Sequence, residues 1–210
     1  MGSYSTYNRK IGDGYTYYKE YTPNPGGDSP YGEPLLPAII TDDNTFGGTN
    51  PSGAELTVER EILDDEISQE LAPIQRLVIG ESASFKITAN AGRMKNLAIA
   101  SGRAESDIAA ISDSLLPRDI PGESLYVGGT IGLDFVALAH EIVNSVSPNL
   151  REWLYMPRCQ AGEGFGFGFK KNEIRELEMV FNILPALQTL FLIAQGRHAL
   201  FQIIFEQEEA

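Results

Sequence analysis

Apolar and polar side chains alternate over several stretches of this chain, and that period predicts β-strands. Residues 54–63 have the sequence AELTVEREIL. Leu56, Val58 and Ile62 occupy one face there, and three glutamates and a threonine occupy the other. Because successive side chains of a strand point to opposite faces, we predict a half-buried strand with an acidic outer face.

Two later segments repeat this pattern. In 77–89, small or apolar side chains alternate with serine, lysine and threonine. In 175–184, four large apolar side chains share one face, and we predict a hairpin that joins this segment to 164–170 (GFGFGFK) through a KKNE turn. The other predicted strands are 15–22, 124–130, 134–143, 151–159, 187–194 and 199–206, with a helix as the alternative for 187–194.

Helical spacing is confined to short stretches. Residues 94–101 (MKNLAIAS) are predicted to form a helix that stops at Gly102. A second helix is predicted from Ile108 and Ile111 at the start of 103–123, before a loop. The polar segment 64–76 is predicted to be a loop with at most one helical turn.

The first quarter of the chain is rich in breaking residues. Residues 1–14 are polar, and 23–53 contain six of the twelve prolines. Proline lacks a backbone donor, so 23–53 are predicted to form a long arm or loop rather than a helix or an inner strand. The predicted organisation is an N-terminal strand and arm over 1–53 and a β-sandwich or barrel over 54–210, within one structural domain.

These elements predict a mainly β (α+β) fold. Eight or nine strands and one or two short helices suit an antiparallel β-sandwich or split barrel with flanking helices and extended arms. The 210 residues are 42% hydrophobic, which is enough for a substantial core.

The balance of charge argues against ordinary nucleic-acid binding. There are 16 basic and 29 acidic residues, and the net charge is -13. Binding to a phosphate backbone needs clustered Lys and Arg, so this surface is expected to repel DNA, although acidity also serves solubility alone. The N-terminus lacks an apolar signal segment, and no stretch approaches the length of a membrane helix, so we expect a soluble chain.

Few residues offer catalytic chemistry. His140 and His198 have no second ligand at metal spacing. The single cysteine, Cys159, excludes an internal disulfide and would be a nucleophile only if the fold brought His140 to it. A structural thiol is the simpler interpretation, and we predict no enzymatic activity.

Two further motifs resemble ligand sites only superficially. Gly162, Gly164, Gly166 and Gly168 alternate strictly with other residues, unlike a dinucleotide-binding loop, and predict a strand with one face free of side chains. The carboxylates at 64–66 lack the spacing of a calcium loop and are predicted to be solvated or to contact another subunit. No cofactor or metal is expected.

Four segments together resemble the major tail tube proteins of long-tailed bacteriophages. They are IGDGYTYYKEYTPN (11–24), the two strands and acidic loop of 53–89, MKNLAIASG (94–102), and the late hairpin of 164–184. The resemblance implies a structural virion protein whose rings, usually hexameric, stack into a tube with a jointly formed inner β-barrel. It also implies copies of the chain and other tail proteins (tape measure, terminator, baseplate) as partners, DNA only in transit, no membrane, and synthesis in the host cytoplasm.

The resemblance also suggests roles for two groups of residues. A negatively charged lumen would deny DNA phosphates the cations they need, and ordinary surface polarity is the alternative. The residues expected to face the lumen are Glu55, Glu59, Glu61, Glu176 and Glu178. The residues expected in a ring-stacking loop are Asp64, Asp65, Glu66, Gln69, Glu70, Gln75 and Arg76.

Other functions stay open at this stage. Departures from the family pattern at 23–53, at 103–123 and after the late hairpin leave a tail-terminator, baseplate or injection-device ring as an alternative. A monomeric carbohydrate-binding β-sandwich is the alternative from another class. Its exposed aromatic platform would consist of Tyr15, Tyr17, Tyr18 and Tyr21.

Overall fold

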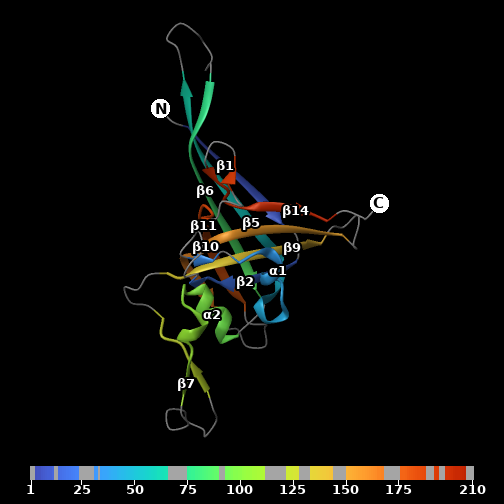
Figure 1. Ribbon diagram of the computed structural model, residues 1–210, viewed down its shortest axis with the longest axis vertical. Helices are drawn as coiled ribbons and strands as arrows, with labels where there is room; N and C mark the ends of the chain where they lie inside the picture. Colours follow the sequence, from blue (N-terminus) through green and yellow to red (C-terminus); the bar gives the residue numbers. More distant parts are fainter. Residues whose placement is uncertain are drawn as a thin grey trace.

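The body of the protein is one large antiparallel sheet that closes on itself. We describe a computed structural model that covers residues 3–11, 14–23, 31–32, 34–65, 75–89, 93–111, 122–127, 133–143, 150–167, 176–187, 192–193 and 197–206. In these residues the strand order is β1–β5–β2–β9–β10–β11–β6, β6 pairs again with β5, and β14 adds to β10 (Figure 1). The strands are β1 (Ser3–Ile11), β2 (Tyr15–Glu20), β5 (Thr45–Asp65), β6 (Gln75–Ala89), β9 (Phe135–Val143), β10 (Arg151–Phe167), β11 (Leu177–Ile183) and β14 (Gln202–Phe205). The prediction of a mainly β, antiparallel barrel or sandwich is confirmed.

Two long strands turn the corners of this barrel. The first residues of β5, Thr45–Gly48, pair with β2, whereas its later part from Ala54 pairs with β6 and β1. β10 pairs with β9 and β14 in its first half and with β11 in its second. The register shifts within both strands, and bulges of this kind bend a strand from one sheet layer into the next.

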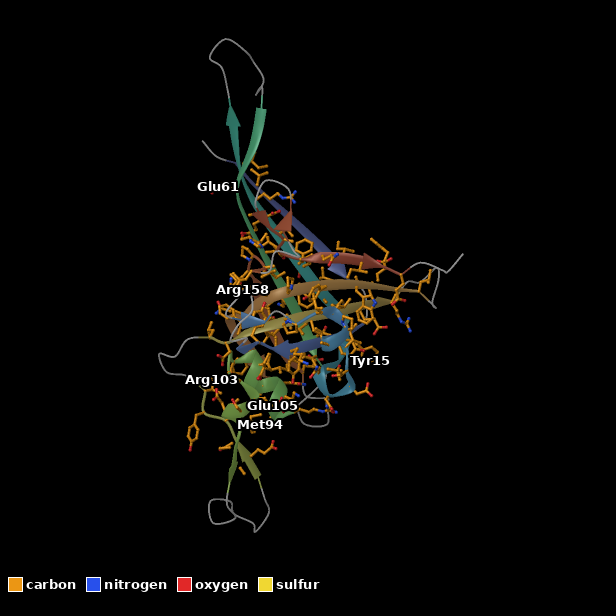
Figure 2. The ribbon with its side chains drawn as sticks, in the orientation of Figure 1. Tyr15, Glu61, Met94, Arg103, Glu105 and Arg158 are labelled. Atoms are coloured by element: carbon orange, nitrogen blue, oxygen red, sulfur yellow. The ribbon has the colours of Figure 1, made fainter. Side chains whose placement is uncertain are left out.

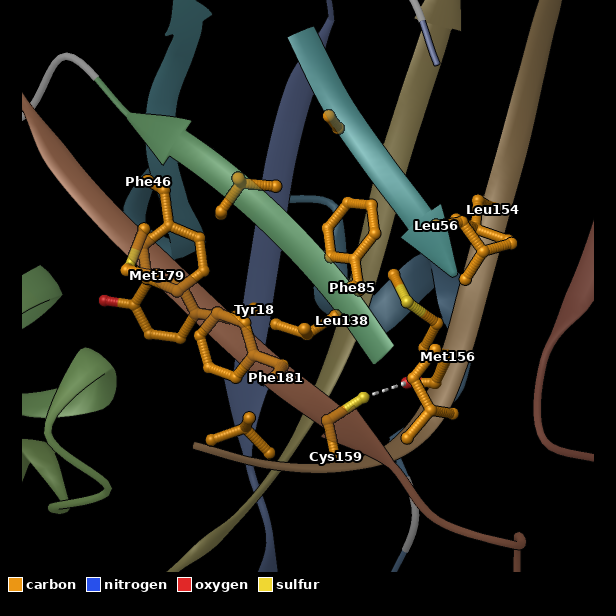
Figure 3. Packing of buried hydrophobic residues seen from close by; sticks show 14 of the residues in the cluster. Tyr18, Phe46, Leu56, Phe85, Leu138, Leu154, Met156, Cys159, Met179 and Phe181 are labelled. Atoms are coloured by element: carbon orange, nitrogen blue, oxygen red, sulfur yellow. Dashed lines mark hydrogen bonds between the residues drawn. The ribbon is translucent and has the colours of Figure 1, made fainter. Parts of the chain in front are cut away.

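The alternating segments supply the barrel core as predicted. Phe85 and Phe181 are fully buried, and Leu56 is nearly so (Figure 3). Leu177 and Val58 are buried as well. Burying a side chain of this size contributes about 1.5–3 kcal/mol each. The apolar faces of β5, β6 and β11 therefore hold the barrel together, and their polar faces are turned outward.

A second, smaller core covers the opposite face of β9 and β10. It combines Ala137, Ala139 and Tyr155 with Ile39 from the short helix α1 (Leu36–Ile39). The Tyr155 hydroxyl donates a hydrogen bond to the carbonyl of Pro34, just before this helix. β9 is thus buried on both faces, which explains its continuous apolar run.

The predicted helix at 94–101 is present as α2 (Met94–Ala100) and packs against the barrel. Ile99 and Ala100 join the core, and the Asn96 side chain donates to the carbonyl of Phe46 over 3.2 Å. Gly102 ends the helix with a φ of 73°, as the sequence predicts.

The interpretation of residues 23–53 as an arm or loop outside the sheet is wrong in two places. α1 forms because Pro37 lies in its first turn, where no backbone donor is needed. β5 already begins at Thr45, and Pro51 lies between Thr49 and Ala54, where the ladder with β6 is interrupted. The polar start of the chain is itself a strand, β1, and pairs with β5.

Other boundaries also differ from the prediction. The helix predicted through Ile108 and Ile111 is wrong, because one 3-10 turn (Glu105–Asp107) is followed by β7 (Ala109–Ile111), which pairs with β8 (Gly122–Ser124). The segments 151–159 and 164–167 form one strand, β10. Short pairs complete the described structure: β3 (Thr22–Pro23) with β4 (Tyr31–Gly32), and β12 (Leu192–Ile193) with β13 (Arg197–His198).

Two hairpins extend from opposite ends of the barrel. The β5–β6 hairpin projects beyond the core at one end of the long axis, and the β7–β8 hairpin projects beyond α2 at the other (Figure 1). The long axis of the molecule is thus defined by these two projections.

Candidate assembly surfaces

The outward face of β5, β6 and β11 carries most of the acidic residues predicted for a lumen. Glu55 and Glu59 lie on β5, and Glu178 lies on β11, with β6 between the two strands. Glu59 and Glu178 are exposed, and Glu55 is half-buried. Two residues farther along β5, Glu61 marks the base of the projecting hairpin (Figure 2). We call the outward side chains of Glu55, Glu59, Glu61, Glu176 and Glu178 the acidic face.

Two basic residues flank Glu55 in the strand ladder of this surface, Lys86 on β6 and Lys10 on β1, and the structure describes the side chain of Lys86. Lys86 on β6 forms an ion pair with Glu178 and lies opposite Glu55 in the ladder. Both side chains of the ion pair are about half exposed, so solvent screens it and it adds little stability. Arg60 pairs with Glu81 over 2.8 Å on the other face of the hairpin and does not offset the acidic face.

Uncharged polar residues lie between the carboxylates on the acidic face. Thr57, Ser84 and Asn182 lie opposite one another across the three strands. Gly166 on β10 lies beside Glu178, and Phe165 next to it is packed against the core. The predicted strand with a side-chain-free face is therefore present at Gly166, whereas the later part of the glycine-phenylalanine motif, from residue 168, lies outside the described residues.

The predicted ring-stacking loop is divided between two strands and their connection. Asp64 and Asp65 end β5, and Gln75 and Arg76 begin β6, so these four residues belong to the hairpin ladder rather than to a loop. The sequence prediction began the loop at residue 64, although β5 continues to Asp65. Strands that extend beyond the core carry polar residues on both faces, so the alternation of apolar and polar side chains that marks a half-buried strand is missing there. Glu66, Gln69 and Glu70 lie outside the described residues.

The opposite end of the molecule exposes apolar side chains. Tyr126 is 83% exposed and Val127 is 52% exposed, just after β8, and Leu133 is exposed before β9. Glu105 and Arg103 lie near the same end, beside α2 (Figure 2). Lys95 on α2 forms an ion pair with Glu105 over 2.8 Å, which links the helix to the base of this end.

The connection between this end and the barrel includes Glu20, a carboxyl group with a shifted pKa. The backbone amide of Glu105 donates a hydrogen bond to the Glu20 carboxylate on β2. Burial raises the pKa of Glu20, while this hydrogen bond opposes the rise and the charge of Glu105 adds to it. Glu20 is therefore more readily protonated than an exposed glutamate.

The histidine and cysteine considered for catalysis have other partners. His140 is buried on β9, and its Nδ1 lies 2.8 Å from the Thr16 hydroxyl. Cys159 is fully buried on β10, where its thiol donates to the carbonyl of Met156 over 3.9 Å (Figure 3). Burial raises the pKa of this thiol well above its usual range, which disfavours the thiolate that a nucleophile requires.

The four tyrosines suggested as a carbohydrate platform do not share one surface. Tyr18 is buried against Phe46 in the core. Tyr17 lies on the other face of β2 and packs beside Trp153, and the Tyr21 hydroxyl donates to the carbonyl of Pro157. Tyr15 is the exposed member, at 51%.

One surface was missed at the level of sequence. The last described strand, β14, exposes Ile203 and Phe205 at 39% and 59%. The available signal was an apolar strand close to the end of the chain, but nothing local indicated that it would be an edge strand.

The described residues contain no group of side chains arranged as a metal-binding site. Within them, no three His, Cys, Asp or Glu side chains gather as metal ligands would. Among the helices of the described residues, none has the length and apolar character needed to cross a bilayer.

Comparison with known proteins gives no match, either to a protein-family model or to a curated protein.

Proposed function

We propose that this chain is a structural subunit of a tailed-bacteriophage virion, which assembles into rings that stack as a tail tube. The observation that carries the proposal is a closed barrel with projecting hairpins at opposite ends of its long axis (Figure 1). The two ends differ, so contact between them is head-to-tail. Head-to-tail contacts that do not close generate open polymers.

The stacking contact joins the two ends of neighbouring subunits. The β5–β6 hairpin of one ring reaches the β7–β8 end of the next, where Tyr126, Val127 and Leu133 are exposed. Exposed apolar clusters on a soluble domain commonly mark interaction sites. Of the seven predicted stacking residues, Asp64, Asp65, Gln75 and Arg76 belong to the ladder of this hairpin, and the other three lie between its strands in the sequence.

The acidic face supports the passage of DNA without retention. Its five carboxylates outnumber the two basic residues at its ladder positions beside Glu55, Lys86 and Lys10. Screening limits electrostatic repulsion to roughly 8 Å at physiological ionic strength, so the face acts on DNA that comes close to the wall. The proposal includes no enzymatic activity and assigns the protein to the virion.

Negative-stain electron microscopy of the purified full-length chain tests this function. We expect tubes of uniform width over a range of salt and protein concentrations. Finite rings that never stack would overturn the tube assignment in favour of a terminator, baseplate or injection-device ring. A monomer under all conditions would overturn assembly altogether.

A shortened hairpin tests the stacking contact. Joining Asp65 to Gln75 through Asn-Gly keeps the described ladder, because this dipeptide suits a two-residue turn between antiparallel strands. We expect the variant to keep its circular dichroism spectrum and to form no tubes. Leu187→Ser, which changes an exposed apolar residue outside both hairpins, is the matched control and should still form tubes. Tubes from the shortened variant would contradict the stacking contact.

A further inference from the structure

The strand β14 has one paired side and one open side. Its residues Gln202–Phe205 pair with residues 152–155 of β10. In the part of the chain that the structure describes, no strand pairs with its other side. An edge of this kind presents unpaired backbone groups and is a template for another strand.

The backbone geometry identifies which residues face the open side. The amide of Glu206 donates to the carbonyl of Arg151 over 3.0 Å, so this position is hydrogen-bonded to β10. In an antiparallel ladder, hydrogen-bonded pairs alternate with non-hydrogen-bonded pairs. The backbone groups of Ile203 and Phe205 therefore point away from β10, toward the open side.

The same two residues expose apolar side chains. Phe205 is 59% exposed and Ile203 is 39% exposed, and both lie on one face of the strand. Soluble proteins usually protect such an edge with lysine, proline or a bulge, and none of these occurs within Gln202–Phe205. Both the backbone groups and the apolar side chains of this edge are thus suited to contact with another strand.

The occupant that the molecule itself offers is β1 of another copy. β1 lies at one end of the strand order and, among the described strands, pairs with β5 alone, so each copy carries one edge of each kind. The sequence of β1 (SYSTYNRKI) contains Arg9 and Lys10 and no acid, whereas Glu206 directly follows β14. Basic residues in the sequence of β1 and an acidic residue next to β14 favour contact between unlike edges and disfavour contact between like edges.

We infer that the open edge of β14 pairs with β1 of a neighbouring copy and extends one sheet across the subunit boundary. This inference rests on the proposed function and supplies its side-by-side contact, whereas the hairpins supply the contact between rings. The contact is heterologous, because β14 of each copy meets β1 of the next, and repetition of one such contact closes a ring when the rotation allows it.

Proline at position 203 tests the edge. Proline is tolerated where a strand's N–H faces solvent, so Ile203→Pro removes an open-side donor without removing a bond to β10. We expect a chain that is folded by circular dichroism and at least a tenfold loss of rings and tubes in negative-stain images. Ile203→Val is the matched control, and it should assemble as the wild type does.

Cysteine pairs test the identity of the partner strand. The natural cysteine, Cys159, is fully buried, so it gives no background cross-linking. With Gln202→Cys on β14 and Ser3→Cys or Ser5→Cys on β1 in the same chain, oxidation should give a ladder of covalent multimers. Each single variant should give no ladder.

The outcomes separate this inference from the function on which it rests. If the wild type forms tubes and Ile203→Pro does too, the edge contact is overturned and the tube function stands. If Gln202→Cys alone gives covalent dimers, β14 meets β14 and the role of β1 is overturned. If the wild type is always monomeric, the proposed function itself is overturned.

Discussion

The hydroxyl of Tyr18 is an unusual group for a protein core. Its ring lies 4.3 Å from the Phe46 ring, between centroids, and the Lys95 ammonium group lies 5.5 Å from the centroid of the Tyr18 ring. The hydroxyl oxygen is buried and has no hydrogen-bond partner among the described residues. Burial raises the pKa of this phenol well above its usual range, so it stays neutral.

We therefore expect Tyr18→Phe to stabilise the protein. Removing a buried polar atom without a partner should raise the free energy of unfolding by about 1 kcal/mol. Tyr155→Phe is the matched control, because the Tyr155 hydroxyl donates to Pro34 and its loss should lower stability by a similar amount. Urea denaturation measures both changes. Destabilisation by Tyr18→Phe would show that its hydroxyl has a bonding partner.

Glu20 gives a pH-dependent prediction. Burial raises its pKa above the ordinary value of 4.5, so the ionised form is less favourable in the folded than in the unfolded state. The resulting penalty is absent below about pH 4.5, where both states are protonated, and grows as pH rises through the folded pKa. Glu20→Gln should therefore raise the melting temperature at pH 7 and leave it nearly unchanged at pH 4.

The size of this effect is limited by exposure. Glu20 is only partly buried, and solvent screening should keep the gain below about 1 kcal/mol. Calorimetry at the two pH values measures the difference. Glu123→Gln, an exposed glutamate on β8, is the control and should change neither melting temperature. An equal gain at both pH values for Glu20→Gln would contradict the electrostatic cause.

At the scale of elements, the end of α2 depends on Gly102. Its φ of 73° is unfavourable for other residues, and an added Cβ would lie 2.5 Å from Cδ2 of Leu133. We expect Gly102→Ala to lower the free energy of unfolding by about 1–3 kcal/mol. Gly80→Ala on β6 is the control, because its Cβ would meet Glu61 at an ordinary 3.4 Å. Equal stability of the two variants in urea would contradict the strain at Gly102.

The elements that sequence could predict are those whose signal is local. Alternation identified β5, β6 and β11 and placed Phe85 and Phe181 in the core, and helical spacing with Gly102 identified α2. The bulges that bend β5 and β10 depend on partner strands that are distant in sequence, so they left no local signal. β1 was missed because its polar residues lack an apolar face.

At the scale of the whole molecule, sequence predicted the acidic strand faces but not their assembly. Glu55 and Glu178 are more than a hundred residues apart, and only the order β5–β6–β11 places them on one surface. The pairing of strands is a long-range property, and single-strand periodicity contains no information about it. The edge formed by β14 was invisible for the same reason.

Charge reversal on the acidic face should create affinity for DNA. We expect the triple variant Glu55→Lys, Glu59→Lys and Glu178→Lys to bind duplex DNA in fluorescence anisotropy, whereas the wild type does not. Each DNA phosphate that a new lysine neutralises should add about -0.9 to the slope of log K against log salt concentration.

A control with the same change in net charge tests whether position matters. Asp107, Glu123 and Asp134 are exposed at the opposite end of the molecule. Changing these three residues to lysine should give weaker binding than the acidic-face variant. Equal binding by both would show that net charge alone, rather than the arrangement on β5 and β11, governs the interaction with DNA.

The pairing of β2 with β9 has a consequence for biosynthesis. Thr16 and His140 touch across a separation of 124 residues, and closure of the barrel also requires β11, which follows both in the sequence. Such long-range topology folds slowly, and the ribosome must release the chain as far as β11 before closure is possible. β14 follows β11, so the edge that we infer to join neighbouring copies is synthesised after every strand of the barrel to which it is added.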